Sequence, residues 1–328
     1  MILTRAPFRI TLGGGGTDLP AYYSKHGGFV VAAGIDKYMF INVNRPVIDD
    51  LIRLKYSSSE MVAHVNELKH AGAREVLKFV GIEKGIEINS IADAPAGTGL
   101  ATSSSYTVAL LRALHTLKHD YVSSKDLAEE ACTIEMQIMK LPAGKQDQYM
   151  ASFGGITVLD IATDGTVKVR KTAISDDAID ELNYNMLVFY TNTMRSSSDI
   201  LHDQSNSIKG EKKDVVESMH MIKELGYKML EALESENLTE VGKIFDTHWQ
   251  HKKRTSNKIS NPNFDKIYGT AKENGALGGK ISGAGGGGFF TFYVEGDHKK
   301  LREAMRNLGL REMKYRFDFE GAKVLVNF

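Results

Sequence analysis

The sequence is poor in cysteine, in net charge and in long apolar runs. Its 328 residues include one cysteine, Cys132, so no disulfide can form within the chain, and a reducing compartment is expected. Lys plus Arg and Asp plus Glu number 41 each, which gives no reason to expect nucleic acid or an anionic membrane as main partner. No run approaches the ~18 apolar residues of a membrane span, and no signal-peptide core is present. We therefore expect a cytoplasmic protein without a membrane or nucleic-acid partner.

Motifs that identify several common enzyme classes are also absent. The chain has no Gly-x4-Gly-Lys-Ser/Thr phosphate loop, no His-Arg-Asp or Asp-Phe-Gly set of protein kinases and no Gly-x-Ser-x-Gly elbow. No group of Cys or His residues has the spacing of a zinc site. Gly-x-Gly-x-x-Gly spacing occurs inside glycine runs but does not open a βαβ unit, which argues against a dinucleotide-binding fold.

Glycine, by contrast, is abundant: 31 residues, many of them in three clusters. The central cluster lies within 95–105. An alternating segment before it, 86–91, predicts a strand, and an amphipathic segment after it, 106–117, predicts a helix. Gly97 and Gly99 permit positive φ and close approach of a ligand, and the free N–H groups of a helix start attract an anion. The stretch predicts a phosphate cradle, with a connecting loop and a serine N-cap as the alternative.

Other segments show simple periodicities. Residues 2–12 predict a strand in which Pro7 marks an edge or a bulge. Residues 28–34 and 38–43 predict a pair of strands, and residues 125–140 and 238–253 predict helices. The run Lys252-Lys-Arg254 at the end of the last helix predicts a solvated helix face, and the spacing of His248 to other residues singles out no partner.

Three motifs in order resemble those of the GHMP kinase superfamily, which includes galacto-, homoserine, mevalonate and phosphomevalonate kinases. They are Ala6-Pro-Phe-Arg-Ile-Thr-Leu-Gly-Gly-Gly-Gly-Thr-Asp18, Pro95-Ala-Gly-Thr-Gly-Leu-Ala-Thr-Ser-Ser104 and Lys280-Ile-Ser-Gly-Ala-Gly-Gly-Gly-Gly288. One such match is weak and three in order are strong. The resemblance implies an α+β, two-domain GHMP kinase fold. We place an N-terminal domain similar to ribosomal protein S5 domain 2 at 1–190 and a ferredoxin-like C-terminal domain at 191–328.

The resemblance also implies ATP and Mg²⁺ as cofactors. The central loop would hold the ATP phosphates through Pro95, Gly97, Gly99, Leu100, Ala101, Thr102, Ser103 and Ser104. Ser103 and Glu135 would be oxygen ligands of Mg²⁺. From the residues alone, Glu135 could instead be a solvated charge on a helix face. Ala101 stands where the family has glycine, so its position must tolerate a Cβ.

Two residues carry the catalytic roles that the resemblance implies. Asp147 follows Glu135 by twelve residues and would accept or orient the proton of the sugar hydroxyl. As an alternative, it could be a loop aspartate that makes a turn hydrogen bond. Arg9 would ease loss of that proton or stabilise the transferring charge, unless it is a surface arginine on an edge strand.

The same resemblance places the substrate at the first and third motifs. The expected substrate-binding residues are Gly14, Gly15, Gly16, Thr17, Asp18, Arg195, Gly285 and Gly286. Asp18 would accept hydrogen bonds from sugar hydroxyls, cap the following helix, or do both. Arg195 has the fork geometry to hold a distal phosphate, and Lys280 is a further candidate.

More narrowly, the first motif resembles the branch that phosphorylates the anomeric oxygen of D-glycero-D-manno-heptose 7-phosphate with ATP. The implied product, heptose 1,7-bisphosphate, would feed synthesis of nucleotide-activated heptose for surface polysaccharide. The alternatives are a fucokinase-type or other sugar-1-kinase and, in a different class, a non-catalytic sensor that binds ATP and sugar. We expect a monomer or a homodimer whose partners are ATP and a small sugar phosphate.

Overall fold

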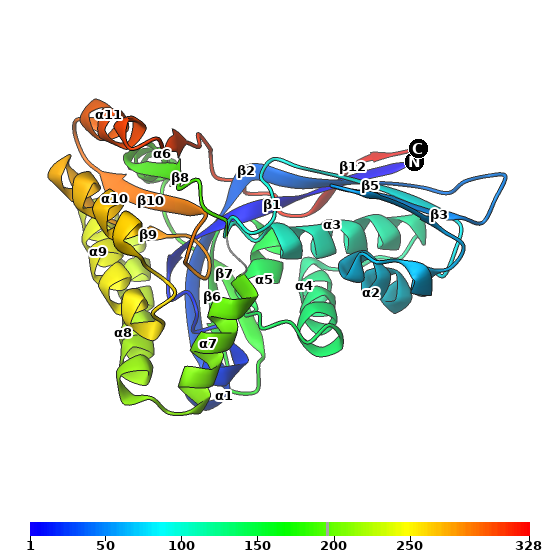
Figure 1. Cartoon of the computed structure of the whole chain (residues 1–328), viewed down its shortest axis with the longest axis horizontal. Helices are drawn as coiled ribbons and strands as arrows, with labels where there is room; N and C mark the ends of the chain where they lie inside the picture. Colours follow the sequence, from blue (N-terminus) through cyan, green and yellow to red (C-terminus); the bar gives the residue numbers. More distant parts are fainter. Residues whose placement is uncertain (195–196) are drawn as a thin grey trace.

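The computed structural model describes residues 1–194 and 197–328. Within them, a sheet of eight strands and a sheet of four lie side by side, with helices packed against each (Figure 1). The larger sheet has the order β12-β1-β2-β5-β3-β4, and β6 and β7 extend it from β2. Its strands are β1 (Ile2–Gly13), β2 (Gly28–Asn44), β3 (Ile52–Lys55), β4 (Ser59–Val62), β5 (Ile86–Ala92), β6 (Ile156–Ile161), β7 (Val167–Lys171) and β12 (Lys323–Asn327).

The long strand β2 organises the larger sheet. It pairs with β1 along most of its length, with β6 through its first residues and with β5 through its last. The prediction of two separate strands here is wrong, because a bulge opposite Pro7 and Phe8 absorbs Asp36 and Lys37 and the strand continues. Pro7 therefore marks a bulge and not an edge, since β1 lies between β12 and β2.

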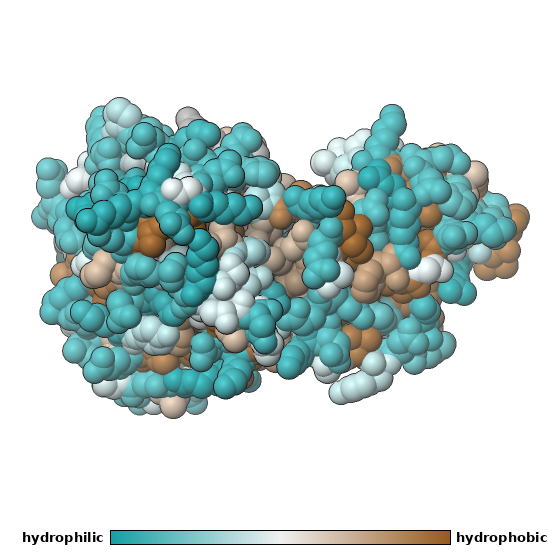
Figure 2. Space-filling model, turned by 90° about the horizontal axis from the view of Figure 1, so that it is seen from below, coloured by the Kyte–Doolittle hydropathy of each residue, from teal (hydrophilic) through white to brown (hydrophobic). Residues whose placement is uncertain are grey.

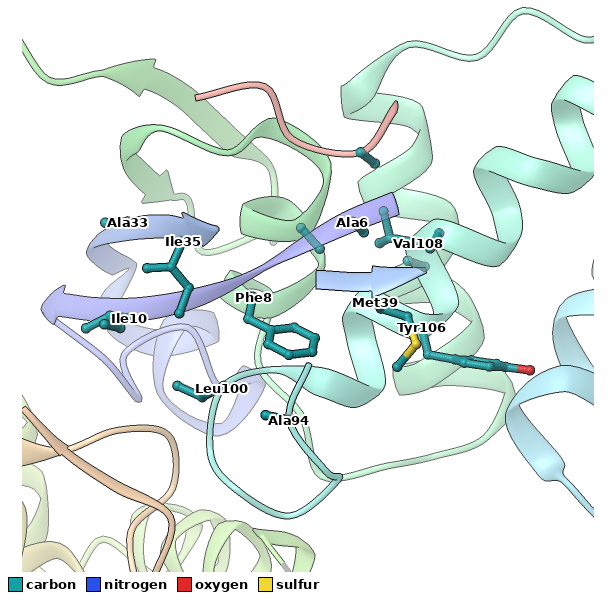
Figure 3. Close-up of a cluster of buried hydrophobic side chains, with 14 of the residues drawn as sticks. Ala6, Phe8, Ile10, Ala33, Ile35, Met39, Ala94, Leu100, Tyr106 and Val108 are labelled. Carbon is teal, nitrogen blue, oxygen red and sulfur yellow. The ribbon is translucent and has the colours of Figure 1, made fainter. Parts of the chain in front are cut away.

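An apolar core joins β1 to the central glycine loop. The side chains of Phe8 and Ile10 on β1 belong to the same apolar cluster as Leu100 of that loop. Figure 3 shows the Phe8 ring beside Leu100 and Ala94. These side chains are at most 5% exposed. Burying a side chain the size of Phe or Leu contributes about 1.5–3 kcal/mol, so the loop is anchored by packing on the strand that carries Arg9.

The smaller sheet has the order β11-β8-β10-β9, and each pair in it is antiparallel. Its strands are β8 (Met186–Tyr190), β9 (Ala276–Ile281), β10 (Phe289–Val294) and β11 (Arg311–Glu312). Strand β8 thus belongs to this sheet although it precedes residue 191, and β12 returns to the larger sheet. The division of the chain at 190 stays a prediction.

Helices cover both sheets. Helix α3 packs under β1 and β2, and α9 packs on β9 (Figure 1). The helices are α1 (Pro20–His26), α2 (Ala71–Val80), α3 (Thr102–Leu117), α4 (Ser124–Cys132), α5 (Gln146–Phe153), α6 (Asp176–Asn185), α7 (Ser197–Lys209), α8 (Lys213–Glu234), α9 (Leu238–Thr255), α10 (Pro262–Glu273) and α11 (His298–Asn307), with a 3-10 turn η1 (Val65–Glu67) and a π-helix η2 (Thr133–Ile138).

The helix predicted over 125–140 is thus two pieces, α4 and the π-helical turn η2 that continues it. Figure 2 shows a largely hydrophilic surface that narrows between a larger and a smaller lobe. Among the helices described, none combines the length and the apolar character needed to cross a membrane.

Candidate active site

A cavity of about 170 Å³ brings residues of all three glycine-rich motifs together. Strand β1, the starts of α3 and α5, and helices α7 and α9 supply the rest of its wall. The polar and charged lining residues are Arg9, Thr11, Asp18, Ser103, Ser104, Glu135, Gln146, Asp147, Ser198, Gln204, His248, Lys252 and Lys280. Such a concentration of titratable groups in one concave site is typical of an active site.

The predicted strand, loop and helix around the central motif are confirmed as β5, the loop and α3. Ala101 stands at the N-cap of α3 with φ of 70° and ψ of 24°, and no side chain caps the helix. These angles lie in the left-handed region, which is costly for a residue with a Cβ. Ala101 therefore adopts the backbone conformation that glycine would take at this position. The uncapped first turn of α3 leaves backbone N–H groups for an anion.

The central loop packs directly on the third glycine-rich loop. A Cβ on Gly99 would lie 2.6 Å from the Ser282 carbonyl oxygen, and one on Gly288 would lie 2.1 Å from the Thr98 carbonyl oxygen. Real Cβ atoms do not approach backbone this closely. The two loops therefore meet through bare backbone at the edge of the cavity.

This contact leads to a stability prediction. Gly288→Ala should lower the free energy of unfolding by at least about 2 kcal/mol more than Gly296→Ala, as measured by urea denaturation. Both glycines have positive φ, 87° and 85°, but a Cβ at Gly296 meets no atom within 4 Å. Both variants carry the strain of an alanine at positive φ, but only Gly288→Ala adds the clash with the Thr98 carbonyl oxygen. Equal decreases in the free energy of unfolding would show that the contact between the loops contributes little to stability.

Arg9 and Asp147 form a partly buried ion pair in the cavity wall. Arg9 Nη2 lies 2.7 Å and Nε 2.8 Å from Asp147 Oδ1, and Nη1 donates to the Gly99 carbonyl oxygen at 2.7 Å. The arginine is 3% exposed, so the surface alternative for Arg9 is wrong. It fixes the carboxylate at the start of α5 relative to the central loop.

Glu135 is a buried carboxylate on the π-helical turn η2. Its oxygens accept hydrogen bonds from Ser104 Oγ (2.8 Å), Thr107 Oγ1 (2.7 Å) and Gln148 Nε2 (2.6 Å). Burial raises its pKa, and the three hydrogen bonds oppose that rise. The alternative of a solvated helix-face charge is thus wrong. Ser103, the predicted companion of Glu135, is exposed and lines the same cavity, whereas Ser104 makes the direct contact.

Asp18 binds the start of a helix, but not the helix that follows it. Its Oδ2 accepts from the backbone N–H of Gln146 (3.0 Å), and its Oδ1 accepts from Gln146 Nε2 (3.0 Å) and Gly16 N–H (3.0 Å). Helix α1 instead begins after Leu19 with no side-chain cap. Burial is the main cause of the raised pKa of Asp18. The expected cap of the following helix is therefore wrong, and Asp18 caps the remote helix α5.

Three consecutive residues at the start of α5 thus connect the three carboxylates of the cavity: two glutamines bond two of them, and the residue between the glutamines is the third. Gln146 bonds Asp18 and accepts from Thr11 Oγ1 (2.6 Å), Asp147 pairs with Arg9, and Gln148 bonds Glu135. The motifs in the sequence predict no role for the two glutamines. Their position on both sides of Asp147, the expected catalytic aspartate, could have indicated that they belong to the site.

The cavity also contains basic residues for which the sequence predicted a solvated face or no definite role. Lys252 is 9% exposed and Lys280 3%, and both line the cavity. The prediction that the run at 252–254 is a solvated face is wrong for Lys252, because its side of α9 packs on β9. His248, one turn earlier, is also buried and lines the cavity, and neither of its ring nitrogens has a hydrogen-bond partner among the residues described.

The remaining predicted residues fall into two groups. Gly15 and Gly16 line the cavity with Asp18, Ser103 and Ser104. The residues that do not line it are Gly14, Thr17, Pro95, Gly97, Gly99, Leu100, Ala101, Thr102, Gly285 and Gly286. Among these, Thr17 holds the first loop together by donating to the carbonyl oxygens of Gly14 and Phe29. Arg195 lies outside the described residues.

Comparison with known proteins places this geometry in a family. Residues 61–155 match the N-terminal domain of GHMP kinases, and residues 229–309 match the C-terminal one. The chain is 30% identical to D-glycero-alpha-D-manno-heptose 7-phosphate kinase from Campylobacter jejuni over 98% of either chain. It is 24% identical to galactokinase from Pyrococcus furiosus over 99% of this chain and 97% of that one.

Solved structures agree with the sequence comparison. A D-glycero-D-manno-heptose 1-phosphate kinase from Bacteroides thetaiotaomicron matches with a TM-score of 0.80 and 25% identity over 100% of both chains. A putative sugar kinase from Campylobacter jejuni matches with a TM-score of 0.76 and 27% identity, over 98% of this chain and 97% of that one. The two-domain α+β fold expected from the motifs is confirmed, and the chain belongs to the GHMP kinase family.

Proposed function

We propose that the protein transfers the γ-phosphoryl group of ATP to the anomeric hydroxyl of D-glycero-D-manno-heptose 7-phosphate and forms heptose 1,7-bisphosphate. The observation that carries this proposal is the Arg9–Asp147 pair, at 2.7 Å, in a cavity shared with Asp18 and the start of α3. The substrate is inferred from the similarity of the whole chain to a heptose 7-phosphate kinase. The product suits synthesis of nucleotide-activated heptose for surface polysaccharide.

In this reaction, Asp147 takes the proton of the anomeric hydroxyl while that oxygen bonds to the γ-phosphorus and the bond to ADP breaks. Arg9 holds the Asp147 carboxylate and places positive charge beside the transferring group. Asp18, fixed by Gln146, accepts hydrogen bonds from other hydroxyls of the sugar. Catalysis then depends on positioning and charge neutralisation, without a covalent intermediate on the protein.

Glu135, Ser103 and Ser104 fit a magnesium ion, which prefers oxygen ligands. Glu135 forms no ion pair within the described part of the chain, and burial raises its pKa, so a bound cation would stabilise its charged form. Mg²⁺ at this place would neutralise charge on the phosphates of ATP. The backbone N–H groups at the start of α3 would hold those phosphates.

Two further parts of the proposal rest on the sequence alone. Arg195 stays a candidate for the distal phosphate. We also propose that the protein acts in the cytoplasm, where ATP is available, as a monomer or a homodimer.

The test is turnover of ATP by the purified protein with Mg²⁺ and one acceptor at a time: heptose 7-phosphate, heptose 1-phosphate, mannose 6-phosphate, fucose, galactose or mevalonate. We expect turnover with heptose 7-phosphate, and phosphorus NMR of the product should place the new phosphate on the anomeric carbon. Turnover with fucose instead would establish a different sugar-1-kinase. ATP binding without turnover of any acceptor would favour a sensor over an enzyme.

A further inference from the structure

Two buried lysines face the cavity without a carboxylate partner. Lys252 on α9 and Lys280 on β9 line the cavity, and neither forms an ion pair within the described ranges 1–194 and 197–328. The carboxylates in the wall are already engaged: Asp147 by Arg9, Glu135 by hydroxyls and an amide, and Asp18, whose charge acts on Lys252, by Gln146 and Gly16. The protein alone therefore leaves two lysine side chains without an ion-pair partner in a concave site.

The positions of these ammonium groups are fixed by their surroundings. Lys252 Nζ donates to the Ile281 carbonyl oxygen at 3.3 Å and to that of Gly283, the first glycine of the third loop. A lysine ammonium has three donors, so two bonds to backbone leave one for a ligand. Lys280 Nζ lies 5.5 Å from the centre of the Phe245 ring, a favourable but weak contact for a cation.

His248 adds a third donor beside the lysines. It lies one turn before Lys252 on α9, so both side chains share one face of the helix. Burial, together with the charges of Lys280 and Lys252, lowers the pKa of His248 well below its usual range. A neutral imidazole still carries one N–H donor, and both of its nitrogens lack a partner among the described residues.

Such an arrangement is costly in the absence of a ligand. Burial and neighbouring positive charge lower the pKa of Lys252 to about 7 and that of Lys280 well below its usual range. Buried charges without partners are rare in proteins unless they bind something of opposite charge. Two lysines and a histidine donor match the oxygens of a phosphate dianion.

The location indicates which phosphate is bound. The nucleotide phosphates already have a candidate site at the uncapped start of α3, near Ser103 and Glu135. Lys252 and Lys280 line one cavity with Asp18, the expected ligand of the sugar hydroxyls. The charge of Asp18 acts on Lys252, as does that of Arg9. Gly16 lines the same cavity, and a Cβ on it would be 3.3 Å from Gln204 Nε2 of α7.

We propose that Lys252, Lys280 and His248 form the subsite for a phosphate monoester at the far end of the sugar acceptor. This inference rests on the proposed kinase function, and it names the groups that distinguish a sugar phosphate from a free sugar. The chemistry that they recognise is a phosphate dianion, which ATP also carries, so the test must separate the two sources.

The test compares binding of D-glycero-D-manno-heptose 7-phosphate with that of the same heptose without phosphate, by calorimetry in the absence of ATP. The wild-type protein should prefer the phosphorylated sugar. Lys252→Met and Lys280→Met should each reduce this preference about 10- to 100-fold, the range expected for loss of a charge-assisted hydrogen bond. Affinity for free heptose should change less than about threefold. Methionine keeps the volume and removes a buried charge, so these variants should fold, which thermal unfolding will check.

Lys253→Met is the matched control. Lys253 is the next residue on α9, and it is half-buried but does not line the cavity. Its Nζ lies 3.5 Å from Asp265 Oδ1. This variant should keep the full preference for the phosphorylated sugar. A preference that survives in Lys252→Met and Lys280→Met, or that the wild-type protein lacks, would overturn the subsite.

The nucleotide is tested by measuring the Kd for ATP with Mg²⁺ in the same variants. A selective rise of this Kd, with the sugar preference intact, would assign the lysines to the nucleotide and overturn the proposal. If the wild-type protein prefers the sugar phosphate and the variants lose that preference, but ATP is not consumed, the subsite stands and the proposed kinase reaction fails.

Discussion

Replacing Asp147 with asparagine should lower kcat about 10³-fold, within the range expected when a positioned general base is removed. Asparagine keeps the shape of the side chain but loses the charge that pairs with Arg9 Nη2 at 2.7 Å. Among the described residues, no other carboxylate pairs with Arg9. Steady-state ATP turnover at saturating heptose 7-phosphate measures the effect, and KM should change much less than kcat.

Asp49→Asn is the matched control for that variant. Asp49 also pairs with an arginine: Arg53 Nη1 donates to its Oδ1 at 2.9 Å, and Arg53 Nη2 donates to its Oδ2 at 2.6 Å. Its side chain is about as exposed as that of Asp147, but it does not line the cavity. Its loss should leave kcat unchanged. If Asp147→Asn retains kcat within about tenfold of the wild type, the residue positions substrate and is not the base.

The substrate-free protein should become more stable as pH rises from about 7 toward 10, and Lys252→Met should lose much of that gain. Burial lowers the pKa of Lys252 from 10.5 to about 7 in the folded state. Between these values the unfolded chain binds a proton that the folded chain does not, so the free energy of unfolding increases with pH. One such group contributes at most about 1.4 kcal/mol per pH unit.

Below pH 7 both states are protonated and the full cost of the buried charge remains. Lys252→Met should therefore exceed the wild type in stability most at pH 6, with the difference shrinking toward pH 10. Urea denaturation across this range measures it, with Lys253→Met as the control that should follow the wild-type profile. The groups that face Lys252 are Lys280, His248, Arg9 and Asp18, and they stay in place in both variants. Parallel profiles for Lys252→Met and the wild type would refute the prediction.

Local pattern predicted the glycine loops well. The alternating run before residue 95 and the helical run after 105 gave β5, the loop and α3, because each signal depends on neighbours in sequence. The twelve-residue spacing of Glu135 and Asp147 pointed to two residues that the structure brings to one cavity. Their chemical roles stay proposals.

Long-range packing decided what the sequence did not reveal. Lys252 looked like part of a charged run, and only the contact of α9 with β9 buries it while Arg254 stays exposed. Asp18 precedes α1 by two residues, yet it caps α5, which follows it by more than a hundred positions. Periodicity along a chain cannot tell which distant element will meet a given face.

The pairing of β12 with β1 has a consequence for the order of folding during synthesis. β1, which carries Arg9, leaves the ribosome well before its partner β12, because all of the described helices lie between the two strands in the sequence. Until then one edge of β1 is open to pairing with other chains. Contacts between residues so far apart form slowly. We expect newly made chains to depend on chaperones until β12 has been synthesised.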